Sequence, residues 1–233
     1  MNEGCGRFLH AMLAVCLLAS SVLALRAQAT VAATLPTAHA QVTFGFERNG
    51  LPVPRFTLDL DEHGSGTYKA EEASANAPQQ IQRPIALTEA TSKKIFGLVR
   101  SVQLTPENCA SKARNIADTG KKTLTYAGPE GTSSCTYNYT ENKNVDALTT
   151  IFQGIAETMD QGRHLDFLHR FDRLGLDDAV SVLAQEVTDG RALELGTIAP
   201  SLHSIADDSE VMQRVRARAT TLLAQIPSSS PSR

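Results

Sequence analysis

The sequence predicts an α+β protein, with a small antiparallel sheet packed by two helices and a helical segment after it. Two observations carry this prediction. Apolar and polar residues alternate with period two in stretches of residues 41–69 and 121–139, which is typical of half-buried strands. After residue 162 apolar residues instead recur every three or four positions, as on one face of a helix. We expect an α+β domain over residues 41–160 and a four-helix segment over residues 163–226.

The first 29 residues have the pattern of a secretory signal peptide. Arg7 precedes an apolar run from Phe8 to Leu25, and Ala27-Gln28-Ala29 places small residues where a signal peptidase reads. The run is shorter than the roughly 20 residues of a stable membrane span. Cleavage after Ala29 is therefore favoured over an uncleaved anchor, and cleavage after Ala40 is the alternative site.

Export places the protein in the periplasm or outside the cell. Roughly 200 residues remain after cleavage, enough for one larger domain or two small ones. No later apolar run could span a bilayer, so we expect no membrane span in the mature chain. The net charge is −3 and the chain has no basic block, which argues against nucleic acid as a partner.

Two of the four cysteines, Cys109 and Cys135, remain after removal of the signal peptide. An isolated pair in an oxidising compartment usually forms a disulfide. Closing a loop of about 25 residues contributes roughly 3–4 kcal/mol in chain-entropy estimates. A reactive or metal-binding pair is the alternative, but there is no C-x-x-C motif and no histidine nearby in sequence. We expect a structural bond that fastens the Cys109 loop to a strand.

Six strands and two helices are expected before residue 160. The strands are Val42–Phe46, Phe56–Leu60, Thr67–Lys69, Ile81–Leu87, Lys121–Ala127 and Thr132–Tyr139. The polar stretch Glu71–Gln80 is expected to be a loop. Thr88 is a suitable N-cap for a helix that reaches Val102. Asn144 opens a second helix, whose apolar stripe runs to Met159.

Four further helices are expected after Gly162. They are Arg163–Leu174, Asp177–Thr188, Arg191–Ala206 and Ser209–Ile226. All the mature lysines precede residue 144, whereas the part after residue 160 contains arginine and no lysine. This change in composition supports a boundary at residues 160–162. Residues 30–40 are expected to be a linker and residues 227–233 a disordered tail.

The last two helices, residues 191–226, resemble a HEAT-type helical hairpin. The residues that carry the resemblance are Leu195-Gly196, Pro200, Asp207-Asp208-Ser209, Val215-Arg216 and Ala219. A solenoid needs about three repeats to bury its own faces, so we expect these helices to pack on the N-terminal domain. HEAT arrays usually bind proteins, so the resemblance implies another exported protein as a partner of the C-terminal helices. The N-terminal part is similar in general type to exported bacterial proteins.

Asp59 and Asp61 are the candidate metal ligands. Together with Gly64 they imitate the first half of a calcium-binding loop. The twelfth position, which should be glutamate, is Ala70, and His63 is a poor calcium ligand. We therefore interpret the segment as a hairpin whose aspartates face solvent, with calcium binding as the alternative. No cofactor is expected.

Two other groups of residues have competing interpretations. His164 and His169 are five residues apart, whereas helical metal pairs are three or four apart. We interpret residues 163–173 as a solvated helix face with ion pairs. Tyr137 and Tyr139, together with Tyr126, could line a shallow ligand surface or take part in ordinary strand packing.

The sequence contains no short catalytic motif. It has no G-x-S-x-G or S-x-x-K element, no P-loop and no G-x-G-x-x-G fingerprint. This favours an exported, non-enzymatic binding or protein-interaction protein. An exported hydrolase with a dispersed active site is the alternative, because a nucleophile, a base and an orienting group can be assembled from distant residues.

Overall fold

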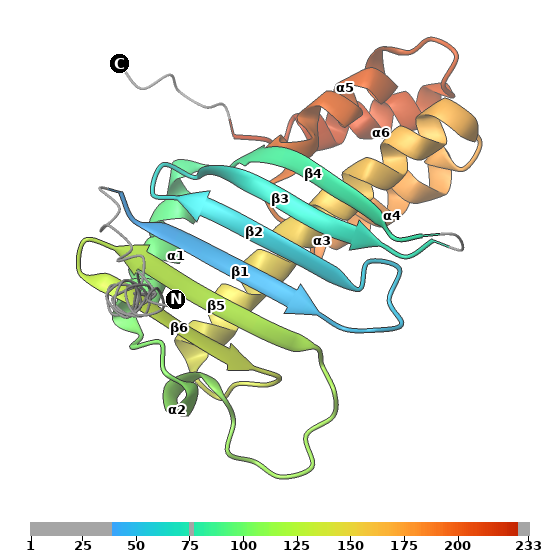
Figure 1. Ribbon diagram of the computed structural model, residues 1–233. Helices are drawn as coiled ribbons and strands as arrows, with labels where there is room; N and C mark the ends of the chain where they lie inside the picture. Colours follow the sequence, from blue (N-terminus) through green and yellow to red (C-terminus); the bar gives the residue numbers. More distant parts are fainter. Residues whose placement is uncertain (1–38, 75–76, 228–233) are drawn as a thin grey trace, which may run out of the picture. The chain divides into compact units, whose positions relative to one another are not determined.

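The computed structural model describes residues 39–74 and 77–227, and its centre is a six-stranded antiparallel sheet (Figure 1). The strands lie in the order β4-β3-β2-β1-β5-β6. They are β1 (Gln41–Glu47), β2 (Arg55–Asp61), β3 (Ser65–Glu72), β4 (Gln79–Ala86), β5 (Lys121–Gly128) and β6 (Gly131–Tyr137). In the central register Phe44 lies opposite Leu58 and Leu124. Apolar positions of neighbouring strands therefore share one face of the sheet.

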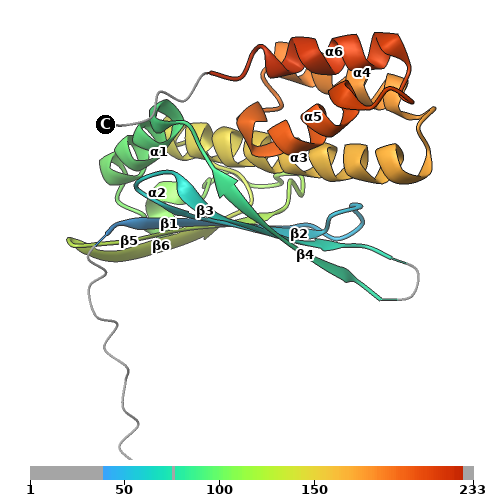
Figure 2. The ribbon, with the colours of Figure 1, turned by 90° about the horizontal axis from the view of Figure 1, so that it is seen from above.

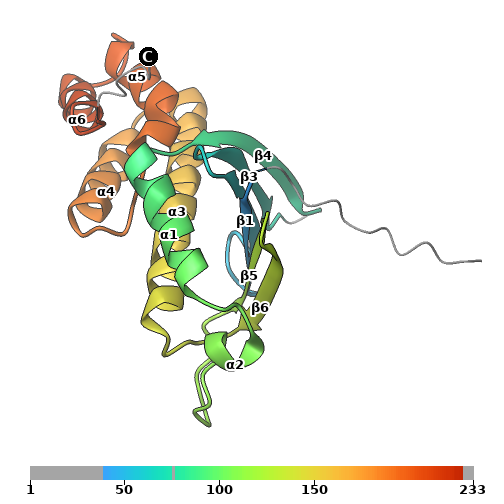
Figure 3. The same ribbon diagram turned by 90° about the vertical axis from the view of Figure 1, so that its left-hand side faces the viewer.

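Helices cover that apolar face. The helical elements are α1 (Glu89–Ser101), α2 (Pro106–Cys109), α3 (Lys143–Phe171), α4 (Leu176–Thr188), η1 (Leu195–Ile198), α5 (Ala199–Asp207) and α6 (Gln213–Leu223). Helices α1 and α3 pack together on one side of the sheet (Figure 2, Figure 3). Helices α4 and α5 pack on α3, and α6 packs on α4 and α5. The predicted α+β class with a C-terminal helical segment is confirmed.

The core lies between the sheet and α3. The rings of Phe44 on β1 and Phe152 on α3 stack with their centroids 4.9 Å apart. The layer of buried side chains continues along α3 to Leu165 and reaches Leu183 on α4. The sheet and the C-terminal helices thus share one continuous core within the compact unit Pro36–Arg233.

Helix α3 is continuous over 29 residues, so the prediction of two helices separated at Gly162 is wrong. Gly162 is buried within the helix, and a Cβ there would lie 2.3 Å from Cγ2 of Ile198. The missing side chain lets η1 approach the helix closely, so this glycine serves packing and does not end the helix. The expected boundary at residues 160–162 falls inside α3.

The last two helices are shorter than predicted: residues 191–194 are not helical, η1 and α5 follow, and α6 begins at Gln213 and not at Ser209. The short helix α2 was not predicted.

The earlier elements lie close to their predicted positions. Thr88 caps α1 as predicted, because its hydroxyl accepts a hydrogen bond from the backbone N–H of Thr91 at 3.3 Å. The loop predicted over Glu71–Gln80 is shorter in the structure, because β3 extends to Glu72 and β4 begins at Gln79. Ladder hydrogen bonds hold these polar residues in strands despite their low strand propensity.

Cys109 and Cys135 form a disulfide, as predicted. Cys109 is the last residue of α2, and Cys135 lies on the edge strand β6. The backbone N–H of Ser111 also donates to the carbonyl of Tyr139 at 2.9 Å. The covalent bond and this hydrogen bond together fasten the α2 loop to the edge of the sheet.

Several predictions concern the ends of the chain. The predicted signal peptide, its cleavage site after Ala29, residues 30–38 of the linker and residues 228–233 of the tail lie outside the described residues. Ala40, the last residue of the predicted linker, is fully buried in the core and so belongs to the fold. In the part of the chain that the structure describes, no helix has the length and apolarity to cross a membrane.

The opposite face of the sheet is polar, and its charges pair across the strands. Glu47 on β1 contacts Arg55 on β2 at 2.9 Å and Lys121 on β5 at 3.3 Å. Arg55 also contacts Glu71 on β3 at 2.9 Å. Exposed pairs of this kind contribute little to stability. Each of these charged side chains nevertheless has an oppositely charged partner on this face.

Candidate functional site

A cavity of about 930 Å³ opens between α3 and the end of the sheet where β1 ends and β2 begins. We call it the α3 cavity. Its apolar wall consists of Phe46, Leu51, Pro52, Val53, Phe56, Ala156 and Phe167. Small-molecule sites occupy roughly 300–1,000 Å³ and are mostly apolar, with a few placed polar groups. The α3 cavity has this size and this kind of lining.

The cavity arises from the shapes of the two layers. Helix α3 is straight, whereas the sheet twists, and the two diverge toward the C-terminal end of the helix (Figure 2). The loop from Arg48 to Pro54 turns at Gly50, which has a φ of 82°. This loop places Leu51 and Val53 opposite α3 and forms one wall of the cavity.

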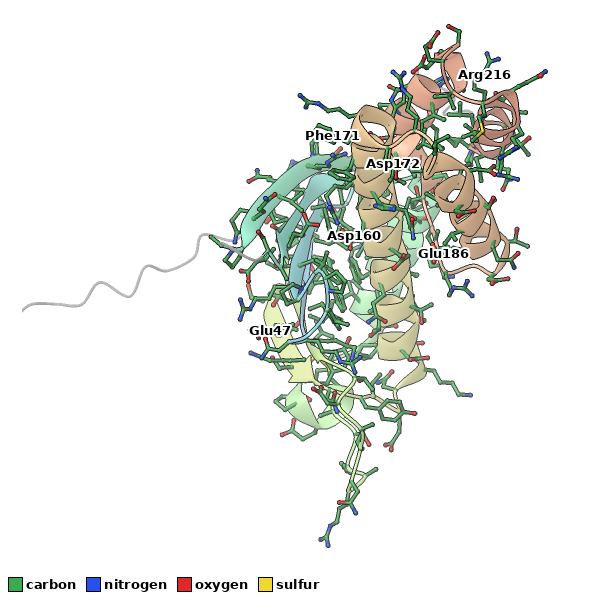
Figure 4. The ribbon with its side chains drawn as sticks, turned by 90° about the vertical axis from the view of Figure 1, so that its right-hand side faces the viewer. Glu47, Asp160, Phe171, Asp172, Glu186 and Arg216 are labelled. Carbon is green, nitrogen blue, oxygen red and sulfur yellow. A yellow bond between two sulfur atoms is a disulfide. The ribbon has the colours of Figure 1, made fainter. Side chains whose placement is uncertain are left out.

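Asp160 is the most strongly perturbed group in the cavity. It lies on α3 between the helix and the sheet (Figure 4). The hydroxyl of Tyr68 on β3 donates to its Oδ1 at 2.7 Å, and no described residue donates to its Oδ2. Burial raises the pKa of Asp160 to about 6, although the Tyr68 hydrogen bond acts against this rise. Burial also raises the pKa of Tyr68.

Arg163 and Glu72 neutralise each other at the same cavity. Nη1 of Arg163 lies 2.8 Å from Oε1 of Glu72 at the end of β3. Nε of Arg163 is buried and has no hydrogen-bond partner among the described residues. The pair joins α3 to the sheet. The charge of Arg163 also acts to lower the pKa of Asp160, but burial outweighs it.

Glu157 lies one helical turn before Asp160 and also lines the cavity. Its Oε1 accepts a hydrogen bond from Gln161 at 3.1 Å, and Gln161 donates equally to Glu186 on α4. Burial and the negative charge of Glu157 raise the pKa of Glu186. Neither Glu157 nor Asp160 has an ion-pair partner in residues 39–74 and 77–227.

Asp59 and Asp61, the candidate metal ligands, lie apart from this cavity and make contacts typical of a hairpin. Asp59 accepts from the Thr43 hydroxyl at 2.9 Å and contacts Lys69 at 3.1 Å. Asp61 accepts two backbone N–H groups of its own turn, each at 2.9 Å. Gly64 completes the turn with a φ of 81°. The described residues contain no group of three or more His, Cys, Asp or Glu placed to hold a metal ion.

Residues 163–173 form ion pairs, as predicted, and most of these residues are exposed or half-exposed. Their charged side chains reach other elements of the fold. The contacts are Arg163 with Glu72, Asp166 with Arg83 at 2.9 Å, and His169 with Asp208 at 2.8 Å. They join α3 to β3, to β4 and to the turn between α5 and α6. His164 lines the α3 cavity.

The tyrosines of β5 and β6 divide between the two interpretations. Tyr126 and Tyr137 are buried, and the Tyr137 hydroxyl lies 2.6 Å from Oγ1 of Thr149 on α3. This is packing between the sheet and the helix. Tyr139 is 47% exposed and lines a second, shallower cavity of about 420 Å³ with Ile116.

The sequence reasoning missed Tyr68, Glu157 and Asp160. Tyr68 and Asp160 are 92 residues apart, and no motif joins them. One signal was available. Glu157, Asp160 and His164 recur at spacings of three and four beside the apolar stripe of α3, so they form a polar row on one side of the helix.

The cavity also contains a serine, a histidine and an aspartate, in Ser74, His164 and Asp160. No hydrogen bond among the described residues links them in series, and the one side-chain donor to Asp160 is Tyr68. No protein-family model matches the chain, and no curated protein matches it in sequence. The arrangement offers an apolar wall and two carboxylates that form no ion pair within the described part of the chain.

Proposed function

We propose that this protein is an exported, non-enzymatic binding protein that holds a small, largely apolar ligand in the α3 cavity. The observation that carries the proposal is the cavity itself, with its size of about 930 Å³ and its apolar wall. Asp160 adds support. A half-buried carboxylate with a raised pKa lowers stability at neutral pH, and groups with perturbed pKa values are concentrated at functional sites.

Dye binding tests this function. The chain has no tryptophan, and Ser74 is exposed at the rim of the cavity. Nile red, a neutral dye that fluoresces in apolar surroundings, should bind the wild-type protein saturably. Ser74→Trp should weaken this binding by about tenfold, because the indole blocks the cavity mouth.

Ser209→Trp is the matched control, since Ser209 is equally exposed in the turn between α5 and α6. Its affinity for the dye should equal that of the wild type. Absence of saturable dye binding, or equal binding by the wild type and both variants, would contradict the proposed site.

Export is supported by two features, and a third bears on the cleavage site. Residues 1–29 have the signal-peptide pattern, and disulfides such as Cys109–Cys135 persist mainly in oxidising compartments. Ala40 is fully buried, so cleavage after Ala29 retains a core residue that cleavage after Ala40 would remove. We expect a periplasmic or secreted protein that begins at Thr30.

The intact mass of the protein from the periplasm or the medium tests this expectation. The mass should correspond to a chain that begins at Thr30 and should rise by two hydrogens on reduction. A mass that retains residues 1–29 would overturn export.

A protein partner at the C-terminal helices has its own supporting observation. Phe171 at the end of α3 is 65% exposed, Leu174 is 79% exposed and Val182 on α4 is 48% exposed. Exposed apolar residues that gather in one region mark interaction surfaces. Together with the HEAT-type resemblance, they support another exported protein as a partner there.

Photo-crosslinking in the native envelope tests this partner. A crosslinking amino acid at Leu174 should yield a discrete protein adduct. The same group at Thr132, which is exposed on β6 away from these helices in sequence, should not. If an abundant, folded sample yields no protein adduct, the proposed partner is contradicted.

The hydrolase alternative rests on Ser74, His164 and Asp160, which line one cavity. A screen of p-nitrophenyl esters tests it. The binding function predicts no hydrolysis above that of buffer. Hydrolysis by the wild type that His164→Ala abolishes would establish the alternative instead.

A further inference from the structure

We propose that the α3 cavity selects a cationic amphiphile, a small molecule with an apolar body and an ammonium head that lies between Glu157 and Asp160. This inference rests on the proposed binding function and adds the chemistry of the ligand. Its basis is the set of charges, free acceptors and apolar surfaces that face the cavity.

The charges that line the cavity do not balance. Arg163 is engaged by Glu72 at 2.8 Å. Glu157 and Asp160 are left without a cationic partner among the described residues. Residues three apart on a helix have Cβ atoms about 5–6 Å apart, so one ammonium group can approach both carboxylates. A ligand with an anionic head would meet two uncompensated negative charges.

The hydrogen-bond acceptors also match an ammonium group. Oδ1 of Asp160 accepts from Tyr68, and Oε1 of Glu157 accepts from Gln161. No described residue donates to Oδ2 of Asp160 or to Oε2 of Glu157. An ammonium group carries three donors and no acceptor, and its hydrogen bonds to carboxylates are of the strong, charge-assisted kind.

The apolar wall accommodates the body of such a ligand. Phe46 and Phe56 lie at the sheet side of the cavity, and Phe167, which is 54% exposed, lies at its α3 side. Aromatic rings make favourable hydrophobic contacts with hydrocarbon chains, and their faces attract cations. Affinity should therefore rise by about fourfold for each methylene that becomes buried.

The proposal has a pH signature. The groups that face Asp160 are Tyr68 and Glu72 from β3, and Glu157, Arg163 and His164 from α3. Burial raises the pKa of Asp160 to about 6, so acidification through this value removes one of the two negative charges. An alkylammonium ligand keeps its charge throughout, so its affinity should fall as the pH falls.

Isothermal titration calorimetry of the exported, oxidised protein tests the proposal. The probes are octylammonium, 1-octanol and octanoate, which each contain eight carbon atoms and differ in the head group. At neutral pH octylammonium should bind about tenfold more tightly than octanol, and octanoate more weakly than either. Asp160→Asn and Glu157→Gln should each reduce octylammonium affinity by about tenfold and leave octanol affinity unchanged.

Two features of the design separate binding from folding. Asn at position 160 retains an oxygen acceptor for the Tyr68 hydroxyl, so Asp160→Asn should fold. Asp166→Asn is the matched control, because Asp166 is a carboxylate of the same helix that contacts Arg83 and does not line the cavity. It should leave octylammonium affinity unchanged.

The outcomes distinguish the two proposals. Equal affinities for octylammonium and octanol, or no loss in Asp160→Asn, would overturn the cationic selectivity while the binding function stands. Failure of all three octyl compounds together with Nile red would overturn the binding function itself. An affinity for octylammonium that rises on acidification would also contradict the inference.

Discussion

At Asp160 the requirements of stability and of binding oppose each other. The side chain is half-buried beside Tyr68, and Oδ2 has no donor among the described residues. An ionised carboxylate in such surroundings loses hydration that one hydrogen bond does not replace. A ligand cation would supply the missing interaction, which is why we relate the raised pKa of this group to function.

Asp160→Asn should make the pH dependence of stability visible. The pKa of Asp160 rises from 3.8 to about 6 on folding, so its contribution to stability is fully present below 3.8 and is lost as the pH rises through 6. The stability of the variant relative to the wild type should therefore increase by about 2–3 kcal/mol between acid and neutral pH. Urea denaturation of both proteins at the two pH values measures this. A difference that does not change with pH would show that the carboxyl is not perturbed.

Glu194 combines an unusual backbone conformation with a structural side chain. Its φ is 60°, in the left-handed region that L-residues rarely adopt. Its carboxylate accepts from the backbone N–H of Thr88 at 2.8 Å and from the hydroxyls of Thr88 and Thr91. The side chain therefore ties the chain before η1 to the N-terminus of α1, where a negative charge is also favourable.

Two substitutions at Glu194 separate these effects. Glu194→Ala should lower the free energy of unfolding by about 2 kcal/mol or more, because it leaves the backbone N–H of Thr88 and the hydroxyls of Thr88 and Thr91 without this acceptor. Glu194→Gly loses the same acceptor but relieves the left-handed strain, so it should be about 1 kcal/mol more stable than the alanine variant. Chemical denaturation gives both values. Equal stabilities would mean that the backbone strain is negligible.

At the scale of elements, α2 and β6 depend on each other. Helix α2 has four residues, too few to be stable alone. Strand β6 is an edge strand that pairs only with β5. The Cys109–Cys135 bond joins the two, and it closes the loop that leads through β5.

Removal of this bond should destabilise the protein without changing its fold class. The double variant Cys109→Ser with Cys135→Ser should lose roughly 3–4 kcal/mol of unfolding free energy, because the unfolded chain regains the entropy of an open loop. Chemical denaturation of the double variant, the oxidised wild type and the reduced wild type measures this loss, and the reduced wild type should be as stable as the variant. A double variant as stable as the oxidised wild type would show that the bond makes no net contribution.

At the scale of the whole molecule, α3 belongs to both halves of the described chain. It packs on β2 and α1 and also contacts η1, α4 and α5. Two glycines on this helix bring the C-terminal segment close. At Gly154 a Cβ would lie 2.8 Å from Leu193, and Gly162 has the corresponding contact with Ile198. The carbonyl of Gly154 also accepts the Leu193 N–H at 3.1 Å.

This shared helix predicts that the sheet and the C-terminal helices unfold together. All four tyrosines lie between residues 68 and 139 and the chain has no tryptophan, so tyrosine fluorescence reports on the sheet alone. Far-ultraviolet circular dichroism reports mainly on the helices. The two urea transitions should coincide. An earlier transition in the circular dichroism signal would mean that residues 163–226 form a separate unfolding unit.

Local patterns in the sequence were sufficient for most elements of the fold. Alternation identified the strands, and the caps and stripes placed α1 and the start of α3 within a few residues. The cysteine count after the expected cleavage indicated the Cys109–Cys135 bond. These features depend on near neighbours or on composition, so a single sequence contains the information they need.

Only the tertiary structure decided the roles that depend on distant residues. A glycine such as Gly162 can end a helix, or it can leave room for a neighbouring side chain, and the sequence does not distinguish the two roles. The structure shows the second role, because Ile198 of η1 packs against the position that a Cβ would occupy. Asp160 became a candidate site because Tyr68 and the wall of the cavity surround it. The physical reason is that desolvation and unpaired charge depend on everything within a few ångströms, and those neighbours come from strands and loops far away in sequence.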